Sequence, residues 1–331
     1  MSKQVLLTGG AGFIGHHILE HLLRVTDWSI TVLDRLDTSG TQGRIAEVLK
    51  EHPQEEQRVR LVWHDLKAPV NSLVAAELGQ PQYILHLAAG SHVDRSISNP
   101  MEFVMDNVVG TCNLLDYART LSTLERFLYF STDEVFGPAP EGVRYMEWAR
   151  YHSGNPYAAS KAGAEELCLA FQNTYKMPIF ITHTMNVIGI RQHPEKFVPL
   201  VIRKVLLGEE IPIHANKECT QAGKRHYIST SDVAEAVMFL LKHAEVGDKY
   251  NLVGERELDN LQLAQTIAGC VGKPLFFKMI DFHSSRPGHD LRYALNGDKM
   301  AIMGWKPAKA IDERLAEIVE WSLAHPFWLG L

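Results

Sequence analysis

QVLLTGGAGFIG (residues 4–15) opens the chain with a short apolar run that leads directly into a glycine loop. Gly9, Gly12 and Gly15 are spaced by three residues, and helical periodicity begins behind them. Glycine lets the backbone turn tightly and approach a pyrophosphate, whose charge the N-terminus of the following helix stabilises. Turn glycines beside a packed helix would give a similar pattern. Its place directly after a strand favours a dinucleotide site.

An acidic residue supports that interpretation. Asp34 stands 19 residues after Gly15, at the predicted end of the second strand. A carboxylate there accepts hydrogen bonds from the ribose hydroxyls and repels a 2′-phosphate, which favours NAD over NADP. Arg35 beside it keeps NADP open, and a turn or cap role is the alternative for Asp34. Asp65, after the third strand, is expected to hold the adenine edge.

Short apolar runs alternate with helical patterns over the first 190 residues. This alternation is typical of βαβ units and a parallel sheet, and helical spacing of apolar residues in the connecting segments indicates sheet-covering helices. The predicted strands are 4–8, 30–33, 59–63, 83–87, 127–131 and 178–182. The expected fold class is therefore α/β, a Rossmann-like doubly wound parallel sheet.

Beyond residue 190 the pattern becomes punctuated by proline, with helix-like segments near 232–243, 260–271 and 310–324. We expect a smaller C-terminal substrate lobe that is interleaved with the last strands of the sheet. The predicted NAD-binding domain is 1–188, with 226–253 returning to it. The predicted substrate-binding lobe is 189–225 and 254–331.

Composition excludes several classes. Of 331 residues, 46% are hydrophobic and 22% charged, as in ordinary globular proteins, and the net charge of -6 gives no basic footprint for nucleic acid. The four cysteines form no CxxC pair, and no apolar run reaches the roughly 18 residues of a membrane span. We expect a cytoplasmic protein that binds neither nucleic acid nor membrane. None of the 16 histidines has HExxH or comparable spacing, so no metal site is predicted.

Tyr157 and Lys161, in the segment YAASK, lie one helical turn apart on one face. A nearby ammonium favours the phenolate and brings a tyrosine closer to the range useful for acid–base catalysis. A surface Tyr–Lys pair is the ordinary alternative. The residues that follow the fifth strand favour the catalytic one.

That strand ends in STDE, residues 131–134, at the sheet edge where open α/β folds bind ligands. Two adjacent carboxylates are costly to hold together unless one is protonated or both are solvated, so a solvated turn is the alternative. In an active site, Asp133 and Glu134 supply what elimination of water requires, namely an acid for the leaving hydroxyl and a base for the adjacent C–H.

Seven motifs carry a resemblance that runs over nearly the whole chain, in order. They are TGGAGFIG (8–15), HLAAGSHVDRS (86–96), STDEVFG (131–137), NPYAASKAGAE (155–165), PEKFVP (194–199), RPGHDLRYAL (286–295) and GWKP (304–307). The chain resembles the dTDP-glucose 4,6-dehydratase family, within the extended short-chain dehydrogenases. The Asp-Glu pair after Ser-Thr distinguishes the dehydratases from epimerases of the same fold.

The resemblance implies a mechanism. Tyr157 takes the proton of the sugar 4-hydroxyl while hydride leaves C4 for NAD, Thr132 holds that hydroxyl, and Lys161 tunes the tyrosine. Glu134 removes the C5 proton, which the 4-ketone has made acidic, and Asp133 protonates the departing 6-hydroxyl. Hydride then returns to C6 and a proton to C5. NAD is regenerated each turnover and is expected to stay tightly bound.

The same resemblance extends the site. The cofactor-binding residues that it implies, together with those above, are Gly9, Gly12, Phe13, Ile14, Gly15, Asp34, Arg35, Asp65, Leu66, Leu87, Ala88, Ala89, Asp106, Ser131, Tyr157, Lys161 and Val187. The substrate-binding residues are Ser91, Thr132, Asn186, Lys196, Phe197, Pro212, His214, Arg225, Asn260, Arg286 and His289. Cationic side chains in this set suit a diphosphate.

The chain departs from the family pattern at several positions. Gly90 stands where a polar or acidic residue is usual, Asp106 where threonine is frequent, and Val187 where asparagine is common. The loop 214–224 is longer than the usual glycine turn before the nucleotide-binding arginine. The first three departures concern the details of the NAD pocket, whereas the loop lies near the nucleotide in the family and leaves the base of the substrate open. The segment 145–154 before Tyr157 also departs from the usual form and leaves the exact sugar open.

The same residues also allow functions other than dehydration of dTDP-glucose. A nucleotide-sugar 4-epimerase or decarboxylase would use the same Tyr157, Lys161 and NAD, and a UDP-, CDP- or GDP-linked sugar would suit the same chemistry. A non-catalytic NAD-binding regulator is the alternative from another class. The helices near 100–120 and 157–175 resemble the pair through which this family dimerises, so a homodimer is expected.

Overall fold

A computed structural model describes residues 2–37, 39–281 and 291–331 of the chain. The chain divides into two compact units, each with its own apolar core. The first consists of Met1–Val135, Asn155–His183 and Ala234–Tyr250, and the second of Phe136–Gly154, Thr184–Val233 and Asn251–Leu331. Arg286 and His289, two of the predicted substrate residues, lie outside the described residues.

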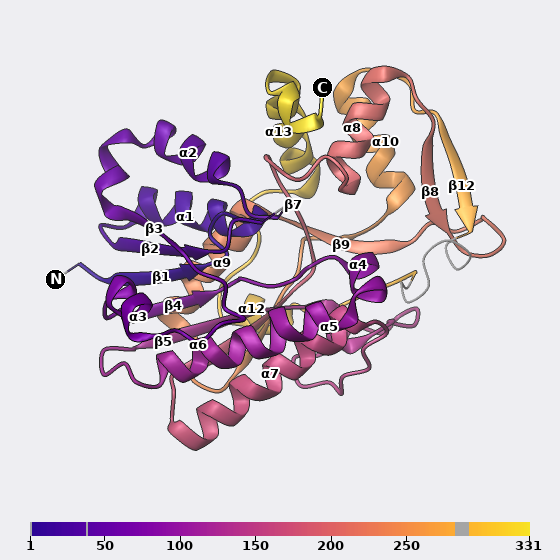
Figure 1. The fold of residues 1–331 in the computed structure, drawn as a ribbon. Coiled ribbons are helices and arrows are strands. Elements are labelled where there is room, and N and C mark those ends of the chain that lie inside the picture. The colour runs from indigo at the N-terminus through magenta and orange to yellow at the C-terminus, as the bar shows by residue number, and fades with distance from the viewer. Residues whose placement is uncertain (1, 38, 282–290) are drawn as a thin grey trace. The chain divides into compact units, whose positions relative to one another are not determined.

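A seven-stranded sheet organises the first unit, in the order β10-β6-β5-β4-β1-β2-β3 (Figure 1). Its strands are β1 (Gln4–Thr8), β2 (Ser29–Asp34), β3 (Val59–Trp63), β4 (Tyr83–His86), β5 (Arg126–Thr132), β6 (Ile179–Thr184) and β10 (Lys249–Leu252). Each of the six strand predictions matches one of these to within two residues at either end. The predicted fold class, a Rossmann-like α/β sheet, is confirmed.

The register of this sheet gathers the strand ends that carry the site. β1 pairs in parallel with both β2 and β4, so that Thr8 faces Leu33 on one side and His86 on the other. His86 in turn faces Tyr129 of β5, which also runs parallel. The carboxyl ends of β1, β2, β4 and β5 therefore share one edge, as ligand binding in open α/β sheets requires.

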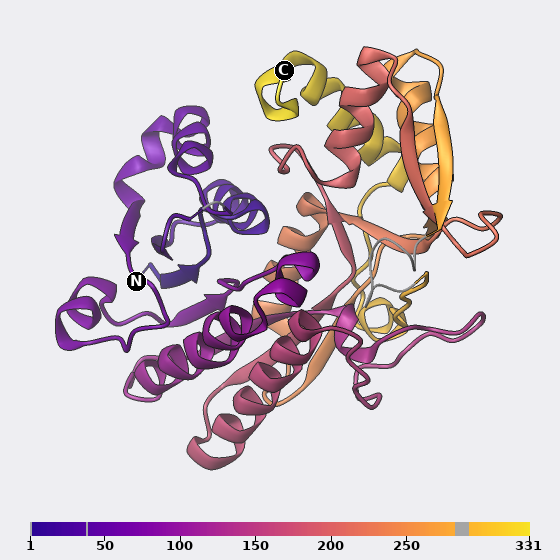
Figure 2. The same cartoon turned by 45° about the vertical axis from the view of Figure 1, so that its right-hand side comes forward.

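Helices connect these strands. They are α1 (Phe13–Val25), α2 (Gln42–Glu51), α3 (Ser72–Leu78), α4 (Val93–Ser98), α5 (Pro100–Phe103), α6 (Gly110–Ala118), α7 (Pro156–Tyr175) and α9 (Thr230–His243), with 3-10 turns η1 (Pro53–Arg58) and η3 (Asp133–Phe136). A π-helical turn, η2 (Val104–Val109), joins α5 to α6 without a break. α6 and α7 lie side by side along the sheet (Figures 1 and 2).

The second unit combines short strands with three packed helices (Figure 2). Its strands form a β11-β9-β7 sheet and a parallel β8–β12 pair, with bounds β7 (Asn186–Ile188), β8 (Ile211–Ala215), β9 (Lys224–Ser229), β11 (Glu257–Asp259) and β12 (Phe277–Asp281). Its helices are α8 (Phe197–Leu207), α10 (Asn260–Val271), α12 (Asp298–Ile302), α13 (Ile311–Ala324) and the turn η4 (Pro326–Leu329). α8, α10 and α13 enclose the core of this unit.

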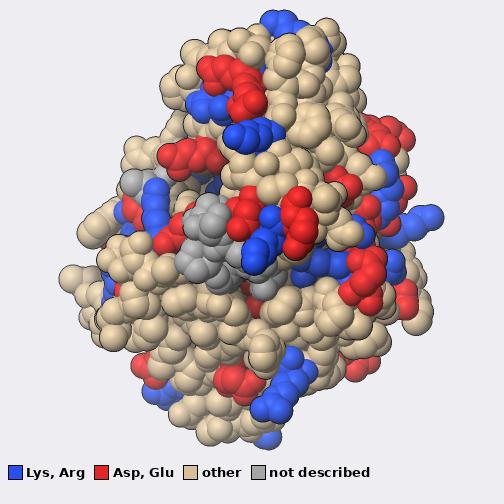
Figure 3. Space-filling view, turned by 90° about the vertical axis from the view of Figure 1, so that its right-hand side faces the viewer, with Lys and Arg blue, Asp and Glu red and all other residues tan. Residues whose placement is uncertain are grey.

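Acidic and basic side chains are interspersed on the face shown in Figure 3. Among the described residues, no helix is both long and apolar enough to cross a membrane. Cys112, Cys168, Cys219 and Cys270 are free thiols.

Candidate active site

The glycine loop forms a cradle that fits a pyrophosphate. A Cβ on Gly15 would stand 2.1 Å from the carbonyl oxygen of Gly9, and one on Gly9 would stand 2.7 Å from the amide nitrogen of Ala88. Gly9 also has a φ of 71°, which side chains disfavour. Gly12 caps α1 without any side-chain hydrogen bond. The first amides of α1, beginning at Phe13 and Ile14, are thus left to an anion, as dinucleotide binding requires.

Asp34 ends β2 and faces this loop. Its carboxylate accepts hydrogen bonds from the amides of Ala11 (3.0 Å) and Leu36 (2.9 Å), and burial raises its pKa. A carboxylate has roughly four acceptor positions, so two amide bonds leave capacity for ribose hydroxyls. The turn role considered from the sequence and the ribose role are therefore compatible at this residue.

The segment after β4 continues the cradle. The Ala88 amide donates to the Thr8 hydroxyl (3.2 Å), which ties the predicted cofactor residues Leu87, Ala88 and Ala89 to the end of β1. Asn107 then holds both backbone groups of Gly90, at 2.7 and 3.1 Å, and donates to the Ser160 hydroxyl of α7 at 2.8 Å. Asn107 was not among the site residues predicted from the sequence.

Thr132, Asp133 and Glu134 form one hydrogen-bonded turn at the end of β5. The Thr132 hydroxyl donates to the Asp133 carboxylate (3.0 Å) and accepts from the Glu134 amide (3.3 Å). The amide of Asn155 donates to the Glu134 carboxylate at 3.0 Å. Asp133 is only 5% exposed. The two carboxylates therefore have different surroundings, as separate acid and base roles require.

Tyr157 comes to the same turn from α7. Its amide donates to the Ser96 hydroxyl (3.1 Å), and its ring packs edge-on against Phe103. Burial raises the pKa of Tyr157 above its ordinary value, the nearby Glu134 and Asp133 charges raise it further, and a hydrogen bond with Thr132 lowers it. This net direction is opposite to the one expected from the Tyr157–Lys161 pair, because desolvation of the phenol outweighs the hydrogen bond.

Lys161 lies one turn further along α7 and is 3% exposed. Its ammonium donates to the carbonyl oxygen of Phe130 at 2.7 Å and lies 4.2 Å from the centre of the Tyr129 ring. Burial lowers the pKa of Lys161 to about 8, although the charge of Glu165 raises it. The lysine is therefore a buried group that can gain or lose its proton near neutral pH.

Glu165 is a buried residue at the end of the motif NPYAASKAGAE (155–165), and it was not among the predicted site residues. Its carboxylate accepts from the Ser131 hydroxyl, contacts His183 Nε2 at 3.0 Å and lies 3.5 Å from Lys249 Nζ. Burial raises its pKa, but the His183, Lys249 and Ser131 contacts outweigh burial and lower it to about 2. The four-residue spacing from Lys161 was a signal that both share one helix face.

In the second unit, Arg225 and Asn260 come together. β9 and β11 pair so that Arg225 faces Leu258, and a Cβ on Gly223 would lie 3.5 Å from the Asn260 amide and 3.9 Å from the Arg225 guanidinium. Arg225 also lies 4.7 Å from the centre of the Tyr293 ring. Arg225 Nη1 donates to the carbonyl oxygens of Lys224 (2.7 Å) and Leu291 (2.8 Å), and the Tyr227 hydroxyl donates to the Asn260 side chain (2.6 Å), so each side chain is held in place.

The long loop 214–224 is a closed hairpin. The Gly223 amide donates to the His214 carbonyl (3.1 Å), and the Asn216 amide donates to the Gln221 carbonyl (2.9 Å). The Asn216 side chain accepts from the Gln221 and Thr220 amides inside the turn. The extra residues of this loop therefore form the tip of a hairpin. At its open end, His214 and Gly223 stay hydrogen-bonded to each other.

The remaining predicted residues divide between the units. Ser91, Leu66, Asp65 and Asp106 belong to the first, while Asn186, Val187, Lys196, Phe197 and Pro212 belong to the second. Asn186, Lys196 and Pro212 are exposed, and Val187 and Phe197 are half-buried.

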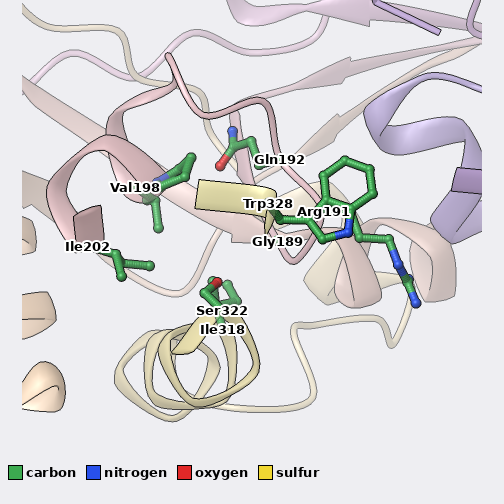
Figure 4. Close-up of a pocket in the computed structure, with 9 residues that line it drawn as sticks. Gly189, Arg191, Gln192, Val198, Ile202, Ile318, Ser322 and Trp328 are labelled. Atoms are coloured by element: carbon green, nitrogen blue, oxygen red, sulfur yellow. The ribbon is translucent and has the colours of Figure 1, made fainter. Parts of the chain in front are cut away.

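A separate small cavity lies in the second unit (Figure 4). Val198 and Ile202 of α8, Ile318 of α13, and Gln192 line it, and Trp328 closes part of its wall. None of the predicted site residues lines it. It belongs to the packing of this unit's helices.

One cluster of metal-ligating types occurs among the described residues. Ligand atoms of Glu20, Glu51 and His52 lie within 4.8 Å of one another, on α1 and at the end of α2. Glu51 is exposed, and no second feature of the described structure points to an ion there.

Comparisons with known proteins bear on this geometry. The profile of the GDP-mannose 4,6 dehydratase family matches residues 6–318. The chain is 33% identical over 350 residues to dTDP-glucose 4,6-dehydratase 1 of Escherichia coli K12, covering 98% of this chain and 94% of that protein. It is similar to the crystal structure of DesIV, a dTDP-glucose 4,6-dehydratase from Streptomyces venezuelae, with NAD and a second ligand bound (TM-score 0.88, 33% identity, 98% of each chain).

A related activity appears among the neighbours as well. The UDP-glucose 4-epimerase of Thermus thermophilus, in complex with NAD, matches with a TM-score of 0.85 and 29% identity, over 96% of this chain and 98% of that one. Fold and site thus define an enzyme of the Rossmann-fold dehydratase and epimerase class. Within that class, the chain belongs to the nucleotide-sugar 4,6-dehydratase family. The resemblance seen in the sequence is confirmed.

Proposed function

We propose that the protein is an NAD-dependent 4,6-dehydratase that converts a nucleotide hexose, in the first instance dTDP-glucose, into its 4-keto-6-deoxy product. The observation that carries the proposal is the turn at the end of β5, where Asp133 and Glu134 stand beside the Thr132 hydroxyl that hydrogen-bonds Tyr157. The relatives of the family support it, because two of those reported above are dTDP-glucose 4,6-dehydratases.

The first step is oxidation at C4 of the sugar. Thr132 holds the 4-hydroxyl and Tyr157 takes its proton. NAD, when bound, would supply the hydride acceptor for C4 and the hydride donor for C6. Lys161, one turn further along the same helix, is proposed to add a positive charge that favours the phenolate of Tyr157. The glycine loop and Asp34 bind and orient the cofactor.

The second step is elimination of water across C5 and C6. Glu134, which accepts the Asn155 amide, acts as the base that removes the C5 proton. Asp133 is the more buried of the two and carries the proton for the departing 6-hydroxyl, because two neighbouring carboxylates at a buried site favour one protonated form. Glu134 then exchanges this proton with solvent and returns a solvent-derived proton to C5.

The second unit is proposed to bind the nucleotide diphosphate. Arg225, with Asn260 beside it, and Lys196 are the donors in described parts of this unit, joined by Arg286 and His289 outside them. A guanidinium fork pairs well with phosphate oxygens. His214, Pro212 and Phe197 are proposed to contact the base or sugar, with Ser91 and Asn186 at the hexose.

Incubation with dTDP-glucose followed by mass spectrometry tests the activity. Loss of one water supports dehydration, whereas a product of unchanged mass indicates the 4-epimerase and loss of carbon dioxide from a uronic acid substrate indicates a decarboxylase. A panel of UDP-, CDP- and GDP-linked hexoses, with and without N-acetyl groups, resolves the base and the sugar. Dinucleotide binding without turnover of any of these would favour the regulator.

A homodimer is also proposed. Large apolar side chains stay exposed on the predicted helix pair: Met101 (69%), Val104 (39%) and Met105 (36%) on α5 and η2, and Tyr175 (51%) on α7. Such exposure is typical of a surface that a second subunit covers. Light scattering at micromolar concentration tests it, and a monomer at every concentration would exclude it.

We also propose a cytoplasmic location. The four free thiols suit a reducing compartment, as does the supply of nucleotide sugars. Fractionation of cells that express the tagged protein would test it.

A further inference from the structure

Two departures from the family pattern lie against each other in the structure. A Cβ on Gly90 would stand 3.2 Å from Oδ2 of Asp106 and 3.1 Å from the Phe103 ring. Both distances are tighter than ordinary contacts, so the missing side chain leaves room for the carboxylate. The neighbouring Asn107 fixes the Gly90 backbone on both its amide and carbonyl groups. Gly90 and Asp106 therefore form one local arrangement.

The Asp106 carboxylate, which occupies the space beside Gly90, binds the guanidinium of Arg35. Nη1 of Arg35 donates to Oδ1 of Asp106 at 2.6 Å and Nη2 donates to Oδ2 at 2.8 Å, while Nε donates to Asp37 at 2.6 Å. All three guanidinium nitrogens thus donate to carboxylates, in the bidentate geometry that suits arginine best. The Asp106 side chain is 5% exposed, and that of Arg35 is 25% exposed. Breaking the pair would remove the two short hydrogen bonds that compensate this buried carboxylate.

Asp106 lies in the π-helical turn η2. Asp106 and Asn107 are consecutive, yet one binds Arg35 after β2 and the other binds Gly90 and the Ser160 hydroxyl of α7. η2 spans Val104–Val109, so both residues lie within its wider turn. Turns of this kind are frequent at functional sites.

The position of Arg35, directly after β2, connects the Asp106–Arg35 pair to the choice between NAD and NADP. In dinucleotide-binding folds, an acidic residue at the end of β2 binds the ribose hydroxyls of NAD, whereas a nearby arginine accommodates the 2′-phosphate of NADP. This chain carries both, as Asp34 and Arg35 in sequence. Which cofactor is preferred then depends on whether the arginine is available to a phosphate.

We propose that Asp106 is a cofactor-specificity residue, which selects NAD over NADP by holding the guanidinium of Arg35 so that it cannot bind a 2′-phosphate. This inference rests on the NAD dependence of the proposed function. Two further charged side chains lie beside this pair. Asp65 lies 3.9 Å from Arg35, and Lys67 lies 3.3 Å from Asp65 and 3.8 Å from Asp106.

Competition between the two dinucleotides tests the proposal without an activity assay. Purified protein is equilibrated with equal concentrations of NADH and NADPH, freed of unbound dinucleotide by gel filtration, and the bound ratio is measured by mass spectrometry. Asp106→Asn is expected to raise the bound NADPH-to-NADH ratio by about tenfold, the factor that corresponds to about 1.4 kcal/mol. Adding Arg35→Ala to that variant is expected to restore the original ratio.

Asp65→Asn is the matched control. It removes the same charge from the same cluster but leaves the Asp106 fork closed, and the adenine edge that Asp65 is proposed to hold is common to both cofactors. It should leave the ratio within about threefold of wild type, a difference of roughly 0.7 kcal/mol. An equal shift in Asp65→Asn would show that net charge, not release of Arg35, sets the preference, and would overturn the proposal.

Arg35→Ala alone keeps the proposal testable if Asp106→Asn does not fold. Because Arg35 is already withheld, its loss should leave the ratio unchanged. A fall in bound NADPH in this variant would show that Arg35 serves the 2′-phosphate in the wild type, against the proposal. Wild-type protein that loads neither dinucleotide would contradict the proposed function itself, whereas an unchanged ratio in an Asp106→Asn protein that loads NADH contradicts only this inference.

Discussion

The side chain of Asn155 bridges the start of α7 and the carboxylate of Glu134. Its carbonyl oxygen accepts from the Ala158 amide at 2.8 Å and so caps the helix that carries Tyr157 and Lys161, while its amide nitrogen donates to Glu134 at 3.0 Å. One residue therefore sets both the helix start and the orientation of the proposed base.

Asn155→Ser separates the two roles. Serine caps helices about as well as asparagine but is too short to reach Glu134. We expect kcat to fall by about ten- to a hundredfold, since mispositioning a catalytic group by ~1 Å costs up to that much. The reduced dinucleotide should accumulate during turnover, because C5 proton removal follows C4 oxidation.

Asn71→Ser is the matched control for that variant. Asn71 caps α3 through the Leu73 and Val74 amides and has no place in the site. It should match Asn155→Ser in its small effect on thermal stability without changing turnover. Equal kcat values for Asn155→Ser and wild type would contradict the positioning role.

Glu134→Gln and Asp133→Asn should stop the reaction after oxidation. General acid–base groups contribute typically about 10²–10⁴-fold, so formation of the dehydrated product should fall by that factor in each variant. Rapid-mixing absorbance of the reduced dinucleotide should still show C4 oxidation. Asp133→Asn should also retain exchange of the C5 proton with solvent, which Glu134→Gln should lose. Loss of C4 oxidation in both would assign the pair to a different step.

The buried Lys161 should make the free energy of unfolding rise with pH in the alkaline range. Its pKa is lowered from 10.5 to about 8 by burial, so the unfolded chain holds this proton more tightly than the folded one. The penalty is present in full below about pH 8 and disappears as pH rises to 10.5, so stability gains with pH across that window. Lys161→Met should raise the free energy of unfolding at pH 7 and remove this gain, while abolishing turnover. Urea unfolding at pH 7 and pH 10 measures both. A destabilised variant at pH 7 would count against a desolvated lysine.

The buried Glu165 should make the protein lose stability in acid. Its pKa is lowered to about 2, so its stabilisation is present above about pH 4.5 and is lost as pH falls towards 2. Glu165→Gln leaves His183 and Lys249 without their charge partner and should cost about 3 kcal/mol at neutral pH. Adding Lys249→Met should recover part of that loss. Additive effects of the two substitutions in urea unfolding would argue against the coupled cluster.

The regular elements could be read from the sequence because their hydrophobic periods are strong. The runs at 4–8 and 59–63 are found as β1 and β3 with the same bounds, and the helical pattern at 260–271 is found as α10. The short strands β7 and β11 were not predicted, because three residues give no detectable period. Their pairing with β9 depends on tertiary contacts.

The candidate site was predictable in its residue types and less so in its contacts. The glycine loop and the Asp-Glu pair carry their chemistry in the sequence itself. The partners of Arg35, Asn155 and Glu165 could not be predicted from the sequence, because each of these contacts joins residues of different strands, helices or turns. Burial also decides the pKa direction at Tyr157, and spacing along one helix cannot reveal it.

Turnover of dTDP-glucose in deuterated water tests the central claim most directly. If Glu134 removes the C5 proton and Asp133 releases the 6-hydroxyl, mass spectrometry will show a product that has lost one water and gained one deuterium at C5, with the C4 hydrogen transferred to C6. A product of unchanged mass with no deuterium at C5 would contradict the account and identify oxidation and reduction at C4 alone.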